Sequence, residues 1–357
     1  MGRADRVHRP TASRGGLVLG VVACAIALLL ASPAAATAHR RVPRALPSGA
    51  LVFTGVEPSS GATFLRLFRV AARGGRARSV FTARPIAADG APLGMERPAF
   101  APDGTALAYS AYELGQGAPY TGPPAIGLAT WPGLTRSLLT PPTIGRDDYP
   151  AWAGNDTVIF SRGLVTPTPG VRLFKIARNG GAATQVAASD SPSADIMAAV
   201  SRGGKLAFVR VGSGANGAWY SYGQNRGAAR VVIAGPDGSV TRELPGSRCE
   251  WPSWSPGATA LVYDCGAPYG RHALYLVRAD GTGLRRLTNG RFDDTTPAWS
   301  PDGRWIAFAR GKIGAHHAIY VMPARGGTAI RVTGRDRAFT DAQQPAWQPA
   351  TTAGRAR

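Results

Sequence analysis

The sequence predicts an all-β protein, and within that class a six-bladed β-propeller of four-stranded antiparallel blades, closed by pairing of its N- and C-terminal segments. Three observations predict this fold. The 357 residues include 46 Gly and 29 Pro, which break helices and form turns. A strand-turn-strand motif recurs about every fifty residues. The two ends of the chain hold complementary parts of one repeat.

Each copy of the motif reads as a short strand, a tight turn and a second, apolar strand. Residues 98–109 and 297–308 are the clearest copies, and their turns are Pro-Asp-Gly. Weaker copies occupy residues 150–160, 197–208 and 252–263, and residues 345–349 form a truncated copy. One marker position, usually aromatic, recurs in all copies at spacings between 45 and 54 residues. The markers are Phe100, Trp152, Val200, Trp254, Trp299 and Trp347.

The complete copies continue with two further strands. Residues 273–281 and 318–327 each predict a third strand and a Gly-containing turn, and residues 284–288 and 330–333 predict a fourth strand. Four short strands per repeat are typical of a propeller blade.

The chain ends predict how the ring closes. Residues 51–82 supply the last three strands of a blade that lacks its first strand, and residues 345–349 supply a first strand without the other three. Pairing the two segments completes the sixth blade and removes exposed sheet edges. The propeller is therefore expected to span residues 49–350.

The pattern Pro-x-Trp-Ser-Pro-Asp-Gly-x-x-Ile-Ala-Phe at residues 297–308 resembles the WD40-like repeat of the TolB-type six-bladed propellers. These occur in bacterial envelope proteins and in the propeller domains of prolyl-oligopeptidase-type peptidases. The resemblance covers residues 49–350 and implies a scaffold for protein contacts. The N-terminal α/β domain of TolB has no counterpart between His39 and Ser48.

The N-terminus predicts export. Arg residues precede an apolar stretch from Leu17 to Leu30, and residues 36–38 (Ala-Thr-Ala) suit a signal peptidase. We expect a signal peptide at 1–38, a linker at 39–48 and a disordered tail at 351–357, with an uncleaved N-terminal anchor as the alternative. The predicted location is the extracytoplasmic cell envelope or the medium. Export argues against nucleic acid as the partner of this chain of net charge +20, but leaves anionic wall polymer or lipid as an alternative.

Enzyme motifs are sparse in this sequence. It contains no Gly-x-Ser-x-Gly elbow, which a propeller-linked peptidase would need, and no Asp-box of the sialidase type. His272 and His317 occupy the same position in neighbouring repeats, before the third strand. They could flank one site, but a structural role is favoured.

Every blade carries a carboxylate four to six residues before its marker. Because the preceding loop enters the innermost strand there, these side chains are expected around one mouth of the central channel. An acidic mouth would attract a basic peptide segment or Ca²⁺, whereas the structural interpretation is that each carboxylate caps a loop by accepting backbone N–H groups. No other cofactor is predicted. The residues are Glu96, Asp147, Asp148, Asp195, Glu250, Asp293, Asp294 and Asp341.

Two long loops and one cysteine pair complete the candidates. Loop 110–124 contains Tyr112 and Tyr120, and loop 211–229 contains Trp219, Tyr220 and Tyr222; both are binding-loop candidates because Trp and Tyr are enriched at binding hot spots. Cys249 and Cys265 flank a hairpin turn centred on Gly257, and are expected to form a structural disulfide.

The sequence thus favours an exported, monomeric, non-catalytic propeller that binds a protein or peptide partner in the envelope. The alternatives are a hydrolase or lyase that uses the acidic channel mouth, and a binder of polyanions.

Overall fold

In the computed structural model, every regular element of the described residues is a β-strand. The described residues are 49–58, 64–81, 93–113, 123–142, 146–164, 170–186, 193–212, 229–266, 270–334 and 338–350. Several predicted features lie outside them: the signal peptide at 1–38, the linker at 39–48, the tail at 351–357 and four of the residues assigned to binding loops, Tyr120, Trp219, Tyr220 and Tyr222. No helix of the described residues is long and apolar enough to cross a bilayer.

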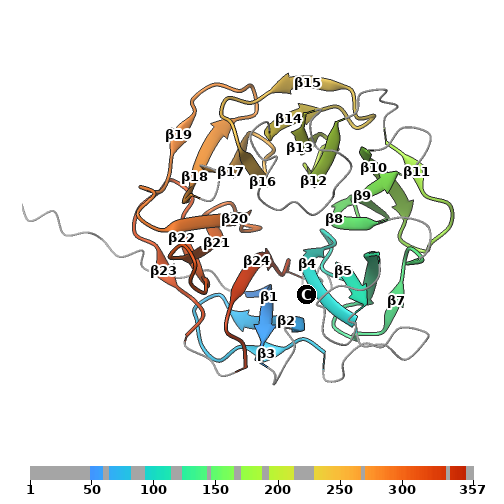
Figure 1. Cartoon of the computed structure of the whole chain (residues 1–357), viewed down its shortest axis with the longest axis horizontal. Helices are drawn as coiled ribbons and strands as arrows, with labels where there is room; N and C mark the ends of the chain where they lie inside the picture. Colours follow the sequence, from blue (N-terminus) through green and yellow to red (C-terminus); the bar gives the residue numbers. More distant parts are fainter. Residues whose placement is uncertain are drawn as a thin grey trace, which may run out of the picture. The chain divides into compact units, whose positions relative to one another are not determined.

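The strands fall into six sets of four that follow the repeat, and each set contains one marker residue on its first, innermost strand. The innermost strands are β4 (Leu93–Phe100), β8 (Asp147–Ala153), β12 (Ala194–Val200), β16 (Cys249–Trp254), β20 (Asp293–Trp299) and β24 (Ala342–Trp347). They surround a common centre (Figure 1). The second strands are β5 (Ala106–Glu113), β9 (Thr157–Leu164), β13 (Leu206–Val211), β17 (Ala260–Gly266), β21 (Trp305–Gly311) and β1 (Ala50–Glu57).

The third and fourth strands lie progressively further from that centre. The third strands are β6 (Ala125–Thr130), β10 (Gly170–Ala177), β14 (Arg230–Ala234), β18 (His272–Arg278), β22 (Ala318–Pro323) and β2 (Phe64–Ala71). The fourth strands, which are the shortest, are β7 (Arg136–Leu138), β11 (Thr184–Gln185), β15 (Val240–Glu243), β19 (Arg285–Arg286), β23 (Ile330–Arg331) and β3 (Arg78–Ser79).

The sheets form an all-β propeller of small antiparallel sheets, as predicted, but they are not six separate four-stranded sheets. Four sheets have four strands each, in the orders β24-β1-β2-β3, β4-β5-β6-β7, β16-β17-β18-β19 and β20-β21-β22-β23. The other eight strands, β8 to β15, belong to one sheet, because Val171 of β10 pairs in parallel with Ala194 of β12. First and third strands run in the same direction, so a close approach between neighbouring sets gives a parallel pair.

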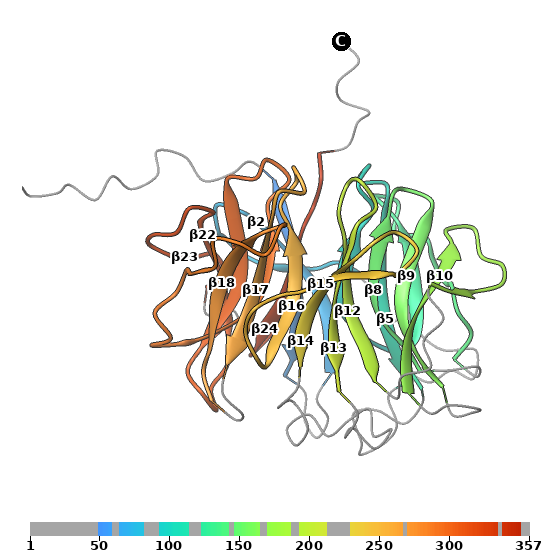
Figure 2. The ribbon, with the colours of Figure 1, turned by 90° about the horizontal axis from the view of Figure 1, so that it is seen from above.

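The two ends of the described chain share one sheet. β24 pairs antiparallel with β1, with Leu51 opposite Trp347 and Gly55 opposite Ala342. The first strand of this set begins at Ala342, three residues before the predicted start at Pro345. Figure 2 shows that the inner strands run between two ends of the propeller. We call the end where they begin the acidic end, and the end at the Pro-Asp-Gly turns the turn end.

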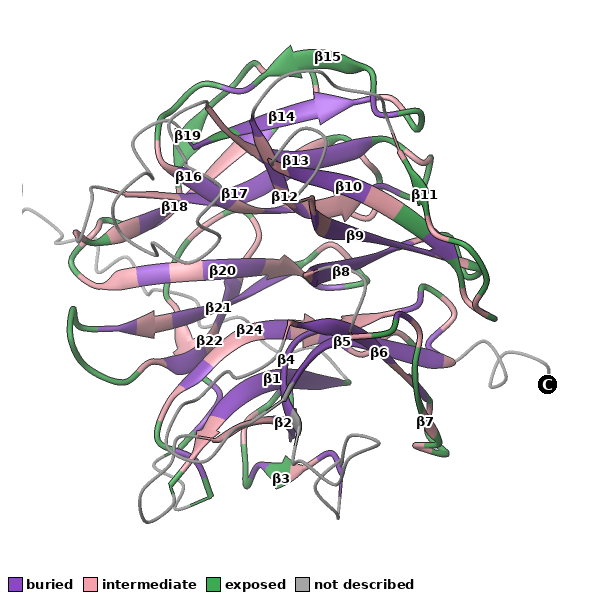
Figure 3. Cartoon of the chain, turned by 45° about the vertical axis from the view of Figure 1, so that its right-hand side comes forward, coloured by how far each residue is buried: buried purple, intermediate pink, exposed green. Residues whose placement is uncertain are grey.

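The core lies between neighbouring sheets, and marker aromatics contribute to it. Trp152 packs with Ala106 and Ala108 of the preceding sheet, and all three residues are buried. Phe160, Phe208 and Phe308 on the second strands are at most 2% exposed, while the fourth strands are largely exposed (Figure 3). Burial of these rings supplies much of the stabilisation of the fold.

Candidate functional site

The inner strands share a feature that the sequence analysis missed. Each pairing of an inner strand with its second strand is interrupted by a β-bulge. Three residues before each marker, a non-glycine residue has φ between 52° and 57°, in the left-handed region. Such residues cost conformational energy and cluster at functional sites. We call them the bulge ring: Arg97, Tyr149, Met197, Trp251, Thr296 and Gln344.

The bulge ring forms the floor of a hollow at the turn end. All six residues line a cavity of about 730 Å³. The guanidinium carbon of Arg97 lies 4.4 Å from the centre of the Tyr149 ring, and the ring centres of Tyr149 and Trp251 are 5.6 Å apart. The side chain of Gln344 accepts a hydrogen bond from the backbone N–H of Arg97, and its own backbone N–H donates to Thr296 Oγ1. These contacts link Arg97 to Tyr149, Tyr149 to Trp251, and Gln344 to both Arg97 and Thr296.

Arg97 is held by a buried polar network. One of its Nη atoms lies 2.8 Å from Glu96 Oε1 and 3.1 Å from Asp148 Oδ1, and it also donates to the hydroxyl of Tyr112. Ser110 Oγ and the Tyr112 hydroxyl donate to the two oxygens of Asp148, at 2.6 and 2.8 Å. Burial raises the pKa of the Glu96 carboxyl, although Arg97 opposes the shift. The network fixes the Arg97 guanidinium among two buried carboxylates and a tyrosine hydroxyl.

The assignment of Tyr112 to a binding loop is wrong. β5 continues to Glu113, so Tyr112 lies within the strand, and it is 2% exposed. The predicted loop start at Ser110 was too early because the apolar pattern of this strand contains Ser110 and Tyr112 as inward-facing, hydrogen-bonded residues.

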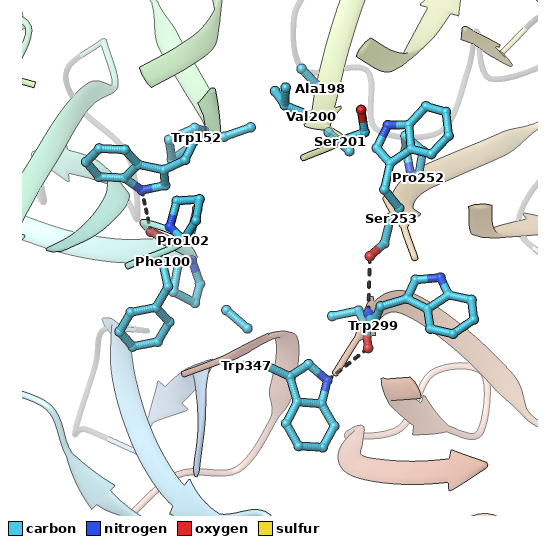
Figure 4. A pocket seen from close by; sticks show the side chains of 18 of the residues that line it. Phe100, Pro102, Trp152, Ala198, Val200, Ser201, Pro252, Ser253, Trp299 and Trp347 are labelled. Atoms are coloured by element: carbon cyan, nitrogen blue, oxygen red, sulfur yellow. Dashed lines mark hydrogen bonds between the residues drawn. The ribbon is translucent and has the colours of Figure 1, made fainter. Parts of the chain in front are cut away.

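The walls of the hollow are mainly apolar and aromatic. Figure 4 shows Trp152, Trp299 and Trp347 around it, with Phe100, Pro102 and Pro252 between them. The indole N–H of Trp152 donates to the Ala99 carbonyl at 2.9 Å, and that of Trp347 donates to the Ala298 carbonyl at 3.0 Å. These bonds link neighbouring sheets. The indole nitrogens of Trp254 and Trp299 are buried and have no hydrogen-bond partner within the described part of the chain.

The predicted carboxylates lie at or near the starts of the inner strands, at the acidic end, but five of them are engaged by arginines: Glu96 and Asp148 by Arg97, and three others by an arginine of the second strand. Asp147 pairs with Arg162, Asp195 with Arg210, and Asp294 with Arg310, each residue directly opposite its partner in the register. Every pair is bidentate, with N–O distances between 2.6 and 2.9 Å. These carboxylates tie an inner strand to its second strand.

The predicted disulfide is confirmed, and it occupies the same register position. Cys249 lies directly opposite Cys265 and is bonded to it, five residues before the marker Trp254, as Asp147 is before Trp152. In this set a covalent bond takes the place of the Asp–Arg ion pair found in three other sets.

Asp293 and Asp341 contact the two predicted histidines. Asp293 accepts hydrogen bonds from the backbone N–H of His272 and lies 3.0 Å from its Nδ1 and 3.1 Å from Nε2 of His317. Asp341 accepts the backbone N–H of His317. Each carboxylate thus caps the third strand of the preceding set, rather than its own loop, and the structural interpretation of the histidines is supported.

These contacts shift the pKa values of the pair in opposite directions. Burial alone would raise the pKa of Asp293, but hydrogen bonds from both histidines hold it well below its usual range. Burial would lower the pKa of His317, but its bonds to Asp293 and Asp341 raise it to about 9.

Glu250 lies opposite Asp264 in the register, and complete burial raises the pKa of Asp264 to about 8.

The acidic end is therefore a series of paired carboxylates rather than an open ring. Five of the predicted carboxylates have oxygens that already accept from Arg, Tyr or backbone donors: Asp147, Asp148, Asp195, Asp294 and Asp341. Across the ten described ranges, no group of three or more His, Cys, Asp or Glu residues is arranged to hold a metal ion. The hollow with the aromatic walls lies at the opposite end of the inner strands.

A sequence signal for the bulge ring did exist. Five of its six residues precede a proline, and all six lie three positions before a marker. Strand propensity, however, gives no reason to expect a positive φ at Arg, Tyr, Met or Trp.

Comparisons with known proteins agree with this architecture. Residues 214–352 match the family model described as TolB beta propeller domain. No curated protein sequence matches the chain. The structure of TolB from Acinetobacter baumannii is similar over 85% of this chain and 68% of that chain, with 16% identity and a TM-score of 0.64. A putative TolB from Agrobacterium tumefaciens is similar over 85% of this chain and 100% of its own, with 14% identity and a TM-score of 0.55.

A chain of a nidogen/laminin complex is also similar, over 85% of this chain and 99% of that chain, with 10% identity and a TM-score of 0.58. At these identities the structural similarities show the fold alone. The family model identifies a TolB-type propeller repeat within residues 214–352, and the similar structures agree with the propeller fold.

Proposed function

We propose that this chain, which carries the TolB-type propeller repeat, is an exported, monomeric, non-catalytic scaffold that binds a protein partner at the turn end. The observation that carries the proposal is the hollow of about 730 Å³ between the six inner strands. Its wall and floor present Trp, Tyr, Met and Arg, which are enriched at the centres of protein interfaces. Tyr149 and Met197 are already buried, so binding of a partner against them costs these two side chains little conformational freedom.

The six-bladed closed ring belongs to the same proposal. Six bulges at equivalent positions support six repeats, and the eight-stranded sheet divides into β8–β11 and β12–β15, which one residue pair joins. The pairing of β24 with β1 supports closure, since it leaves neither chain end as a free inner edge.

Two observations support a location outside the cytoplasm. The Cys249–Cys265 disulfide is the kind of bond that persists in oxidising compartments. The basic and apolar N-terminal segment at 1–38 has the order of a secretory signal. N-terminal sequencing of the mature protein is expected to begin at His39, and a thiol assay of the unreduced protein is expected to find no free cysteine among residues 39–357.

A second candidate function, an enzyme at the acidic end, is favoured by one observation. Asp264 and Asp293 lie near His272 and have pKa values shifted in opposite directions, as an acid and base pair requires. The same shifts follow from burial and from the capping bonds at the third strands, so the scaffold is the better-supported function. Hydrolase and lyase assays of Asp293→Asn against wild type separate the two candidates, because only an enzyme loses turnover.

The scaffold is tested by capture of partners from envelope extract. The wild-type mature chain is compared with Trp251→Ala at the floor of the hollow and with Ile313→Ala, a 53% exposed apolar residue in the turn between β21 and β22 at the acidic end. A protein captured by wild type and Ile313→Ala but lost with Trp251→Ala supports the proposal. Capture that Trp251→Ala leaves unchanged contradicts it.

A further inference from the structure

A second hollow lies between the third strand of the β24-β1-β2-β3 sheet and the turn after β6. Its volume is about 490 Å³. We call it the arginine groove, because Arg69, Arg76 and Arg78 all line it; the other side is formed by Trp131, Pro132 and Leu134. Gln348 lines the groove, and its neighbours Trp347 and Pro349 line the channel hollow, so the two open near each other at the turn end.

Two of the arginines are placed against each other. Arg69 of β2 is directly opposite Arg78 of β3, and both side chains are exposed. Like charges opposite each other in a sheet destabilise it. Among the described pairings of third with fourth strands, no other pairs two residues of like charge. The stability of the free protein does not account for this arrangement.

The positive charge of the groove is not neutralised by the residues that the structure describes. The described lining contains no Asp or Glu, and no ion pair joins Arg69, Arg76 or Arg78 to a described carboxylate. Arg162, Arg210 and Arg310, by contrast, each meet an aspartate. Arg69 Nε donates to Gln348 Oε1 at 3.1 Å, which fixes the guanidinium at one edge and leaves its two Nη groups for another acceptor.

The opposite wall is apolar and held in place. The Trp131 ring packs edge-on against Phe100, with ring centres 5.0 Å apart and an angle of 89°, and its backbone N–H donates to the Thr105 carbonyl. Val70 and Val80 also line the groove, and Val80 belongs to the same apolar cluster as Trp131. A ligand for the groove therefore combines strong negative charge with an apolar body.

We infer that the arginine groove binds an organic phosphate: Arg69 and Arg78 hold the phosphate from both sides, and Trp131 packs against the attached group. Guanidinium groups bind phosphate oxygens through paired N–H donors, and a phosphate monoester carries nearly two negative charges at neutral pH. The groove volume lies within the range of small-molecule sites. This site is separate from the partner-binding hollow and does not depend on it.

The test measures binding of phenyl phosphate and inorganic phosphate by calorimetry in low-salt buffer. Wild type is compared with the double variant Arg69→Gln/Arg78→Gln and with Arg285→Gln/Arg286→Gln, which removes the same charge from an exposed strand outside the groove. We expect one saturable site in wild type and in the control, and binding weaker by about tenfold or more in the groove variant. Absence of saturable binding in wild type, or equal binding in the groove variant, overturns the inference.

Two further measurements test whether Trp131 contacts the apolar part of the ligand and which kind of molecule carries the phosphate. Trp131→Phe is expected to reduce the preference for phenyl phosphate over inorganic phosphate, and an unchanged preference contradicts the role of Trp131. Vesicles of phosphatidylglycerol are compared with vesicles of phosphatidylcholine by co-sedimentation. Retention on phosphatidylglycerol that the groove variant loses identifies a lipid headgroup as the source, whereas binding of phenyl phosphate alone identifies a soluble or polymer-borne phosphate.

The unliganded protein gives an independent check. Because Arg69 and Arg78 repel each other, Arg69→Gln is expected to raise the melting temperature of the free protein while abolishing the additional stabilisation by phenyl phosphate. A variant that is stabilised by phenyl phosphate as much as wild type is would contradict the inference, whatever its own melting temperature.

Discussion

At the scale of single residues, equivalent positions of the repeat differ in ways that a mutation series can measure. Four of the six markers are tryptophans in similar packing, yet only two of them make the indole hydrogen bond to the preceding sheet (Figure 4). The same residue type at the same repeat position therefore makes different contributions to cohesion between sheets.

The indole bonds can be measured with Trp→Phe substitutions. Trp152→Phe and Trp347→Phe each remove an N–H···O=C bond and take the donor from a part-buried carbonyl, whereas Trp254→Phe removes an indole N–H that lacks a partner within the described chain. All three lose similar apolar area, so the difference isolates the bond. Urea unfolding is expected to show that the first two cost about 1 kcal/mol more than the third. Equal costs would mean that the bonds contribute nothing net.

At the scale of elements, one register position links the first two strands of a set by different chemistry. An Asp–Arg pair occupies it in three sets and the disulfide in a fourth. The remaining two sets have Met95 opposite Ala111 and Gly55 opposite Ala342. This position accepts an ion pair, a covalent bond or apolar contact, because the flanking ladder hydrogen bonds already fix the register.

The ion pairs predict an asymmetric response to substitution. Asp294 is fully buried, so Asp294→Asn leaves the Arg310 guanidinium without its charge partner and is expected to cost about 3 kcal/mol of unfolding free energy. The double change Asp294→Leu/Arg310→Met is expected to cost less than the single one. Glu243→Gln, which breaks the exposed Arg230–Glu243 pair, is the control and costs less than about 1 kcal/mol. A double variant with a lower unfolding free energy than Asp294→Asn would contradict this explanation.

The contacts of Asp293 and Asp341 with the histidines predict a pH dependence of stability. His317 has a pKa of about 9 when folded against 6.5 when unfolded, so the stabilisation is complete below pH 6.5 and is lost as the pH rises through 9. Asp264, with a folded pKa of about 8, acts in the same direction, because the folded state must release a proton that the unfolded state has already lost. The facing carboxylates Asp293 and Asp341 stay ionised over this window.

Melting temperatures measured from pH 6.5 to pH 9 are therefore expected to fall. His317→Gln is expected to flatten that slope, while His316→Gln, at an exposed neighbouring position, leaves it intact. A slope that His317→Gln does not change would show that another group carries the dependence.

The sequence predicted the strands and turns closely, because each repeat places apolar strands and a tight turn, Pro-Asp-Gly in the two clearest copies, at similar offsets from its marker. It placed the carboxylates at the acidic end and paired Cys249 with Cys265. It did not predict the arginine partners, since Arg162, Arg210 and Arg310 are some fifteen residues away and become neighbours only through the register. It also missed the bulge ring, where tertiary packing overrides the preference of Tyr149 or Trp251 for ordinary strand geometry.

At the scale of the whole molecule, the proposed function depends on a closed ring. The hollow at the turn end takes lining residues from all six inner strands, including Gln344 and Trp347 of β24. β24 is joined to its sheet by its pairing with β1. If closure is lost, the floor loses Gln344, which accepts from Arg97 and donates to Thr296, and the marker Trp347 leaves the core.

The most direct test is thermal unfolding of two shortened chains. One ends at Pro349 and keeps β24; the other ends at Asp341 and lacks it. The first is expected to melt like the full chain. The second is expected to melt at a much lower temperature and without a single sharp transition, because β1 and the buried residues around Phe53 lose their cover. A chain ending at Asp341 that melts at the same temperature as the full chain would contradict the closed ring and, with it, the hollow on which the proposed function rests.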